Sequence, residues 1–182
     1  MSADQSPHLS ATRDPIARGP EPGEALRVAY LDLLKLCLCD LAGTGTTSVI
    51  WNAVDPVHSR ELTGEDLMKR VVGQDWPLHG LTMVGLDRLD DLQSLVEDVI
   101  ANDVPGDLIE AGSWRGGAAI LMRATLDAYG EGDRTVWVCD SFAGFPTPDR
   151  EAFPTEDPKL DPLGDIDFLS VPEEEVLSLI HI

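Results

Sequence analysis

The sequence predicts an α/β protein organised around one β-α-β unit. A short apolar run at residues 107–109 is followed by a helical pattern at 118–129, in which apolar residues recur at helical spacing. A second run, at 135–139, is rich in β-branched and aromatic residues and is typical of a strand. Glycines and polar residues separate these segments, as expected for the turns that join a helix to its two strands.

A carboxylate follows each predicted strand, Glu110 after the first and Asp140 after the second. The turn between Glu110 and the helix contains Gly112, Gly116 and Gly117. Glycine tolerates unusual backbone conformations and lets a ligand approach the backbone closely. We expect the helix that follows to present free N–H groups and its positive dipole end to a ligand crevice.

The two carboxylates favour one class of ligand. Asp140 could accept hydrogen bonds from both hydroxyls of a ribose, as the acid at the second strand end does in NAD-binding folds. The dinucleotide fingerprint is absent, because Trp114 replaces its middle glycine and no third glycine follows at the required place. Glu110 disfavours a phosphate and favours an ammonium group. S-adenosylmethionine combines a ribose, an adenine and an ammonium group without a phosphate.

Residues 110–117, 133–142 and 144–146 resemble the macrocin O-methyltransferase family. Its members are class I enzymes that use S-adenosylmethionine to methylate sugar hydroxyls on macrolides and related natural products. The resemblance extends from about Tyr30 to Val176. It implies that the chain forms the N-terminal part of a Rossmann-like class I methyltransferase fold whose sheet is incomplete. It also implies a set of cofactor-binding residues, namely Thr82, Met83, Glu110, Gly112, Ser113, Trp114, Gly116, Gly117, Asp140, Ser141 and Phe142.

The resemblance further implies a reaction that depends on Mg²⁺. The family holds its metal with aspartates in later motifs of the type Asp-Gly-Asp and Asp-Asp-Tyr, and neither motif occurs in this chain. We therefore assign no metal ligand here and expect the catalytic residues to lie beyond residue 182. Residues 177–182 depart from the family pattern, and we expect them to be the non-native end of a reading frame cut short. A natural helix end is the alternative.

The sequence divides into segments of different character. Residues 1–23 are polar and proline-rich, so we expect a disordered tail. Residues 24–105 are expected to form a helical N-terminal cap and lid region, and residues 106–176 the first part of the S-adenosylmethionine-binding domain. A helix at 24–40 could cover that domain or pair with a second subunit in a homo-oligomer.

Within the cap region, two further helices are expected. Residues 63–72 should form a short helix with Thr63 as its N-cap and Asp66 as the acid of a capping box. A longer helix should begin at Thr82 and run to about Ile100. Near the C-terminus, Ser170 is expected to cap another helix.

Charge and composition limit the partners and the compartment. The chain has 182 residues with 13 basic and 33 acidic side chains, a net charge of −20, which disfavours nucleic acid and anionic membranes as partners. It lacks an apolar run of ~20 residues, the length that spans a bilayer. Three cysteines without disulfide or zinc spacing favour reduced thiols and a cytoplasmic location.

Two functions therefore remain open. The first is an O-methyltransferase whose acceptor is a small molecule with a sugar hydroxyl. The alternative is a non-catalytic nucleoside-binding module or a degenerate scaffold.

Overall fold

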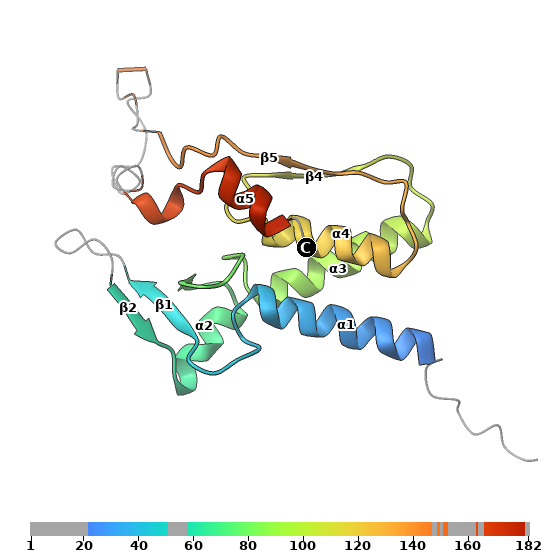
Figure 1. Ribbon diagram of the computed structural model, residues 1–182, viewed down its shortest axis with the longest axis horizontal. Coiled ribbons are helices and arrows are strands. Elements are labelled where there is room, and N and C mark those ends of the chain that lie inside the picture. The colour runs from blue at the N-terminus through green and yellow to red at the C-terminus, as the bar shows by residue number, and fades with distance from the viewer. Residues whose placement is uncertain are drawn as a thin grey trace, which may run out of the picture.

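The computed structural model describes residues 22–50, 58–146, 149, 151–152, 163 and 166–180 (Figure 1). Most of the expected tail lies outside these residues. Pro22 and Gly23 begin helix α1 (Pro22–Leu38), so the first helix starts two residues earlier and ends two residues earlier than expected.

The β-α-β unit is present. Strand β4 (Leu108–Ala111) leads to helix α4 (Gly117–Ala128) and then to strand β5 (Val136–Cys139). The two strands are parallel, with Leu108 opposite Val136 and Ala111 opposite Cys139, and they lie together along α4 in Figure 1. Glu110 lies inside β4 rather than after it, whereas Asp140 directly follows β5 as expected. The fold is mixed α/β, and this sheet has two strands within the described residues.

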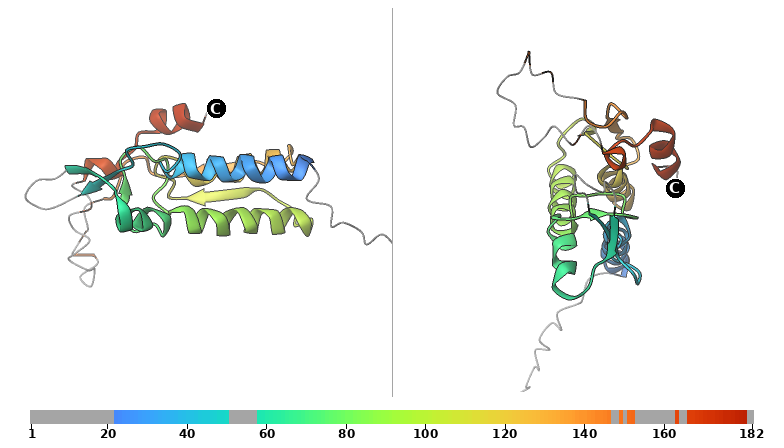
Figure 2. Two further views of the ribbon diagram at one scale, coloured as in Figure 1. Left: turned by 90° about the horizontal axis from the view of Figure 1, so that it is seen from below. Right: turned by 90° about the vertical axis from the view of Figure 1, so that its left-hand side faces the viewer.

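Helix α4 lies at the centre of the core, with nine of its twelve residues buried. One side of it packs on α1 and on helix α3 (Leu86–Ala101) through a cluster that includes Leu31, Leu89 and Leu121. The other side packs on α3 and on the inner face of β4 and β5. Figure 2 shows α1 and α3 side by side with nearly parallel helix axes, and helix α5 (Glu173–Ile180) lies outside this pair. Buried methyl groups of α4 therefore hold the sheet and the N-terminal helices together.

A three-stranded antiparallel sheet within residues 47–77 was not predicted. Strand β1 (Thr47–Ile50) lies between β2 (His58–Glu61) and β3 (Trp76–Pro77). The strands have two to four residues each, which is too short for a clear alternating pattern in the sequence.

Arg70, in helix α2 (Leu67–Val71), joins this sheet to α1. It is 1% exposed and forms a bidentate ion pair with Asp75, at 2.9 Å from Nε and 2.8 Å from Nη2. Its Nη1 and Nη2 atoms also donate to the backbone oxygens of Cys39 and Thr47. One buried guanidinium thus connects the end of α1, the first residue of β1 and the segment before β3.

Three expectations about helix starts and caps were wrong. Helix α3 begins at Leu86, so Thr82 and Met83 belong to the preceding loop. Gly85, the last residue of that loop, has φ +81° and approaches Gly73 so closely that a Cβ on Gly85 would lie 2.3 Å from the Gly73 nitrogen. Only glycines permit this contact.

The other two corrections concern caps. Thr63 precedes the 3₁₀ turn η1 (Gly64–Asp66) but forms no side-chain cap, and Asp66 pairs with Arg60 and Lys69 instead of closing a capping box. Helix α5 begins at Glu173, so its cap position is Pro172 and Ser170 lies two residues too early to be its cap.

Candidate cofactor site

A cavity of about 580 Å³ lies at the carboxyl ends of β4 and β5. Its volume is in the range of small-molecule sites, and its position is the one at which ligands bind to parallel sheets. Five of the residues expected to bind the cofactor line it, namely Met83, Gly112, Trp114, Asp140 and Ser141. The remaining lining residues were not predicted, and they are Cys139, Gly144, Phe145 and Leu169. Of these, Gly144 and Phe145 belong to a stretch on which the family resemblance already depended, and that was a usable signal.

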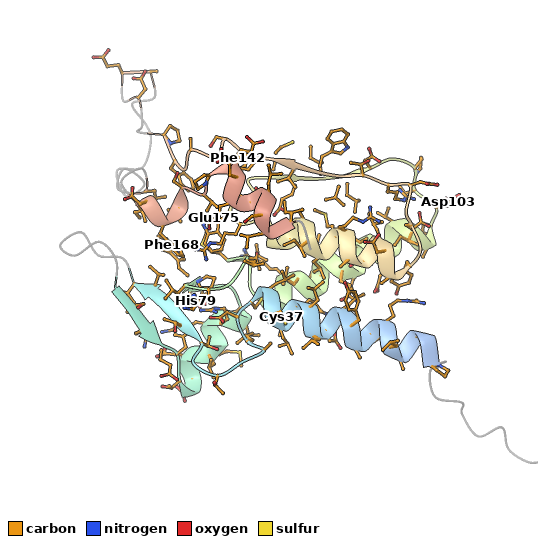
Figure 3. The ribbon with its side chains drawn as sticks, viewed as in Figure 1. Cys37, His79, Asp103, Phe142, Phe168 and Glu175 are labelled. Atoms are coloured by element: carbon orange, nitrogen blue, oxygen red, sulfur yellow. The ribbon has the colours of Figure 1, made fainter. Side chains whose placement is uncertain are left out.

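Asp140 holds the turn between β4 and α4 in place. Its Oδ2 accepts hydrogen bonds from the backbone N–H groups of Ser113 at 2.7 Å and Trp114 at 3.2 Å, and its Oδ1 accepts one from Phe142 at 2.9 Å. Burial opposes the ionisation of Asp140, but these hydrogen bonds outweigh it and hold the pKa below its ordinary value. Phe142, labelled in Figure 3, and Trp114 both have positive φ, and the bonds to Asp140 compensate for that strain. A carboxylate oxygen can accept two bonds, so Oδ1 retains capacity for one hydroxyl donor.

Glu110 is also engaged within the chain. Its Oε2 accepts a hydrogen bond of 2.9 Å from the N–H group of Ala119, in the first turn of α4. Burial raises the pKa of Glu110 to about 7, the bond from Ala119 opposes that rise, and the nearby charge of Asp140 adds to it. The N–H group of Gly117 donates to the oxygen of Leu81. The expectation of free N–H groups at this helix start was therefore wrong for two of its first three residues.

The three turn glycines have different roles. A Cβ on Gly117 would lie 2.5 Å from the Leu81 oxygen, and one on Gly116 would touch Ile180 at 3.3 Å. These two glycines are required by contacts within the chain. Gly112 has φ +82° and no protein atom within 4 Å of the place of its Cβ. Of the three, it is Gly112 that lines the cavity, and the space beside it is open to a ligand.

An aromatic cluster that the sequence did not reveal supports the wall of the cavity at Trp114, the member of the cluster that lines it. Phe168, from the 3₁₀ turn η3 (Asp167–Leu169), lies between Trp114 and Trp76, with ring centroids at 5.4 and 6.2 Å. The Trp114 indole donates to the Phe168 oxygen at 3.1 Å. Arg115 lies over the Trp114 ring at 4.4 Å and donates to the backbone oxygens of Leu78 and Gly80 at 2.9 and 3.1 Å. The cluster joins the turn, the loop before α3 and the segment before α5.

The remaining predicted residues lie close to the cavity but do not line it. Thr82 and Ser113 are each 5% exposed, and the Thr82 hydroxyl accepts a bond from the N–H group of Val84. Phe142 contacts Asp140 through its backbone, as described above. Phe168 and Glu175, labelled in Figure 3, come from η3 and α5, and Glu175 lies 3.9 Å from the Arg115 Nε atom.

The described residues do not fit a magnesium site. They contain no group of three or more histidine, cysteine, aspartate or glutamate side chains arranged to hold an ion. We accordingly assign none of the described residues to Mg²⁺. Among the same residues, no helix has the length and apolar character needed to cross a membrane.

Comparison with known proteins identifies the relatives of this chain. The family described as Macrocin-O-methyltransferase (TylF) matches residues 28–180. A demethyldecarbamoylnovobiocin O-methyltransferase of Streptomyces niveus is 45% identical over 151 residues, which cover 81% of this chain and 53% of that protein. The 8-demethyl-8-(2,3-dimethoxy-alpha-L-rhamnosyl)-tetracenomycin-C 4'-O-methyltransferase of Streptomyces olivaceus is 48% identical over 124 residues, covering 68% of this chain and 44% of that protein.

A solved structure agrees with this relationship. The O-methyltransferase NovP superposes with a TM-score of 0.69 and 38% identity, over 85% of this chain and 58% of that one. The chain thus spans about half the length of the relatives it matches.

Proposed function

Because this chain belongs to the macrocin O-methyltransferase family, we propose that it provides the S-adenosylmethionine-binding part of an enzyme that methylates a sugar hydroxyl on a natural product. The relatives act on antibiotic precursors, and the name of the Streptomyces olivaceus relative specifies the hydroxyl by its position, 4'. The acceptor proposed here is a small molecule of that class.

One observation carries the proposal, which is the cavity at the strand ends with Asp140 and Gly112 in its wall. Oδ1 of Asp140 has room for one further hydrogen bond, which suits a single ribose hydroxyl better than the pair that the sequence suggested. The open space beside Gly112 suits a ligand that passes close to the backbone. Met83, which also lines the cavity, offers a soft thioether that can lie against a sulfonium group.

Bound S-adenosylmethionine would supply an electrophilic methyl group, which a hydroxyl oxygen attacks in line with the bond to sulfur. The residues of this chain bind and orient the cofactor, and such positioning can account for a large part of a rate enhancement. Glu110 contributes indirectly, because its bond to Ala119 fixes the start of α4 relative to β4. We assign no general base among the described residues.

The alternative, a nucleoside-binding module without catalysis, shares the same cavity and differs only in turnover. The described residues lack a metal site, and this observation favours the alternative for the chain taken alone. We expect the purified chain to bind S-adenosylmethionine but to transfer no labelled methyl group to a sugar hydroxyl in the presence of Mg²⁺. Turnover would show that a base or metal ligand has been missed.

Titration calorimetry tests the cofactor site. An affinity loss on Asp140→Ala would not be sufficient, because that change also releases three N–H groups of the turn. We therefore propose a double-mutant cycle with Asp140→Asn and with S-adenosylhomocysteine lacking one ribose hydroxyl. If Asp140 binds that hydroxyl, removing either partner should weaken binding about tenfold, and removing both should weaken it little further.

Two results would count against the site. The parent chain could fail to bind either S-adenosylmethionine or S-adenosylhomocysteine. Alternatively, the effects of Asp140→Asn and of removing a ribose hydroxyl could be additive, whether the 2'- or the 3'-hydroxyl is removed. That result would place the ribose away from Asp140.

A further inference from the structure

Arg115 lies behind the wall of the cofactor cavity and contacts three separate parts of the chain. Its Nη1 atom donates to the backbone oxygens of Leu78 and Gly80, in the loop before α3. Its guanidinium lies 4.4 Å from the centre of the Trp114 ring and 5.2 Å from that of Phe168 in η3. One side chain therefore connects the glycine turn, the loop before α3 and the segment that leads into α5.

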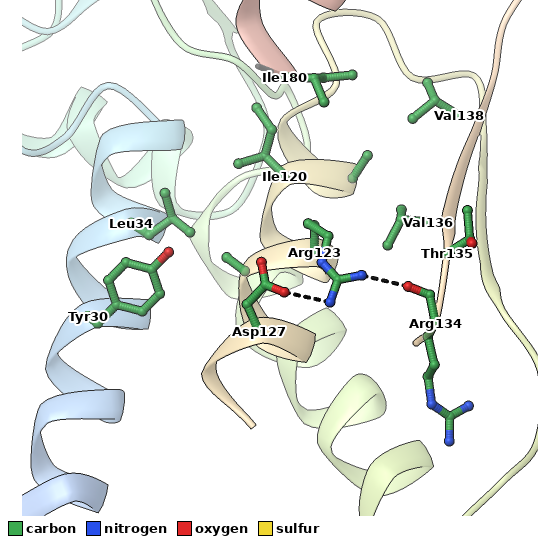
Figure 4. Close-up of a pocket in the computed structure, with 12 residues that line it drawn as sticks. Tyr30, Leu34, Ile120, Arg123, Asp127, Arg134, Thr135, Val136, Val138 and Ile180 are labelled. Carbon is green, nitrogen blue, oxygen red and sulfur yellow. Dashed lines mark hydrogen bonds and ion pairs between the residues drawn. The ribbon is translucent and has the colours of Figure 1, made fainter. Parts of the chain in front are cut away.

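The charge of Arg115 is incompletely balanced. Arg123, which lines a separate cavity between α1 and β5, donates to a carboxylate oxygen of Asp127 at 2.6 Å (Figure 4). Arg115 has one ion-pair partner among the described residues, Glu175, whose Oε1 atom is 3.9 Å from Nε. That distance is about 1 Å longer than a charge-assisted hydrogen bond. Because the Nε atom is buried without a hydrogen-bond partner among the same residues, a closer approach of Glu175 would satisfy it.

Glu175 is positioned to make this approach. It lies in the first turn of α5, and its side chain is 50% exposed (Figure 3). The next residue, Val176, packs on the glycine turn, 3.5 Å from the position that a Cβ on Gly116 would take. Since α5 already touches the turn, a small rearrangement brings the Glu175 carboxylate to the Nε atom of Arg115. The loss of water from that carboxylate opposes the rearrangement in the free chain.

The walls of the cavity link this ion pair to a bound ligand. Trp114 of the glycine turn and Leu169 of η3 both line the cavity. The Trp114 indole donates to the Phe168 oxygen at 3.1 Å, so the turn and η3 approach each other at this point. A ligand that contacts Trp114 and Leu169 buries more apolar surface when η3 moves toward the turn. Because η3 leads into α5 through residues 170–172, the same movement brings Glu175 toward Arg115.

We propose that Arg115 and Glu175 are positioning residues of the cofactor site and that their ion pair closes when S-adenosylmethionine occupies the cavity. Neither side chain is among the residues that line the cavity, so both act through others. The closed pair holds Trp114 and Leu169 against the ligand. The proposal rests on the cofactor binding proposed above and adds one consequence to it. The charge of Glu175 should contribute to cofactor affinity but hardly to the stability of the free chain.

The test compares Glu175→Gln with Glu174→Gln in the 182-residue chain. Both variants remove one negative charge from the first turn of α5 and keep the size of the side chain, so their effects on the helix dipole are matched. Titration calorimetry with S-adenosylhomocysteine should show that Glu175→Gln binds about fivefold to tenfold more weakly than Glu174→Gln. Without ligand, the two variants should have the same midpoint in urea unfolding, because the pair is open in the free chain.

Arg115→Lys completes a double-mutant cycle. Lysine retains the positive charge but lacks the Nε–H donor. If that donor binds Glu175 in the complex, the affinity loss of Arg115→Lys combined with Glu175→Gln should be smaller than the product of the two separate losses. Hydrogen exchange provides a second measurement. Addition of S-adenosylhomocysteine should protect residues 168–176 in Glu174→Gln and should protect them less in Glu175→Gln.

Equal affinities of Glu175→Gln and Glu174→Gln would overturn the role of the ion pair while leaving the cofactor assignment intact. A lower urea midpoint for Glu175→Gln, in parallel with its lower affinity, would overturn it as well, because the residue would then support the fold in general. If the parent chain binds no S-adenosylhomocysteine, the cofactor assignment itself is wrong, and the ion pair has no ligand to hold.

Discussion

Replacing Arg115 by methionine should loosen the wall of the cofactor cavity. The side chain is 18% exposed and donates two hydrogen bonds, to the oxygens of Leu78 and Gly80. It also lies over the rings of Trp114 and Phe168, at 4.4 and 5.2 Å. Methionine preserves much of the apolar packing volume but removes the charge and all the donors.

The magnitude follows from these contacts. Each hydrogen bond from a charged donor contributes about 1.5–3 kcal/mol, and a partly desolvated cation over an aromatic ring adds about 0.5–2 kcal/mol. The cost of burying the guanidinium offsets part of this gain, and burial indeed lowers the pKa of Arg115, against the opposing effect of Glu175. The Nε atom adds no hydrogen bond, because it is buried without a hydrogen-bond partner among the described residues. We expect a net loss of about 2–4 kcal/mol in the free energy of unfolding, out of a total of roughly 5–15 kcal/mol.

Urea unfolding followed by far-ultraviolet circular dichroism measures this loss, and near-ultraviolet circular dichroism reports on the packing of the two tryptophans with Phe168. Arg123→Met is the matched control, because Arg123 also donates to two backbone oxygens, those of Arg134 and Glu131. It should lower stability but leave the near-ultraviolet spectrum unchanged. A loss below about 0.5 kcal/mol for Arg115→Met, within the range of ordinary surface substitutions, would refute the argument. An equal spectral change in both variants would refute it as well.

Three further changes test other parts of the structure. Because the pKa of Glu110 is raised to about 7, the folded state binds its proton more tightly, and stability should fall as the pH rises from about 4.5 to about 7; Glu110→Gln should flatten that part of the curve of unfolding free energy against pH. Gly117→Ala should cost about 1–3 kcal/mol in urea unfolding, because its Cβ would lie 2.5 Å from a backbone oxygen, whereas Gly132→Ala, with open space around it, should cost little. Asp75→Asn should lower stability by about 3 kcal/mol, because it removes the bidentate carboxylate of the buried Arg70 guanidinium and leaves it only Asp40, at 3.6 Å from Nη1, and an unchanged thermal midpoint would contradict that role.

The sequence by itself determined the β-α-β unit and the family. The strand and helix patterns between residues 107 and 139 are local, since each is set by the spacing of apolar residues along a few turns or strand positions. The turn with Gly112 and its neighbours and the acid at position 140 are also contiguous motifs, so they could be read without knowing the rest of the fold. The same holds for the family relationship, which follows from those motifs.

The roles of individual residues within those motifs depended on tertiary contacts. Asp140 was expected to bind the ribose hydroxyls of a ligand, and the structure shows that it also fixes the turn through three backbone N–H groups. Gly117 was expected to face a cofactor, yet it is required by the backbone of Leu81, 36 residues earlier in the chain and bonded to it at 2.9 Å.

The small sheet and the aromatic wall were decided by the tertiary structure alone. Arg70 and Arg115 each hold segments that are far apart in the sequence, by donating to backbone oxygens that every residue type carries. Every residue has a backbone oxygen, so the residue types in the sequence do not show which of these oxygens a buried arginine binds. The strands of two to four residues depend on such long-range partners for their stability, because segments this short cannot form a sheet on their own.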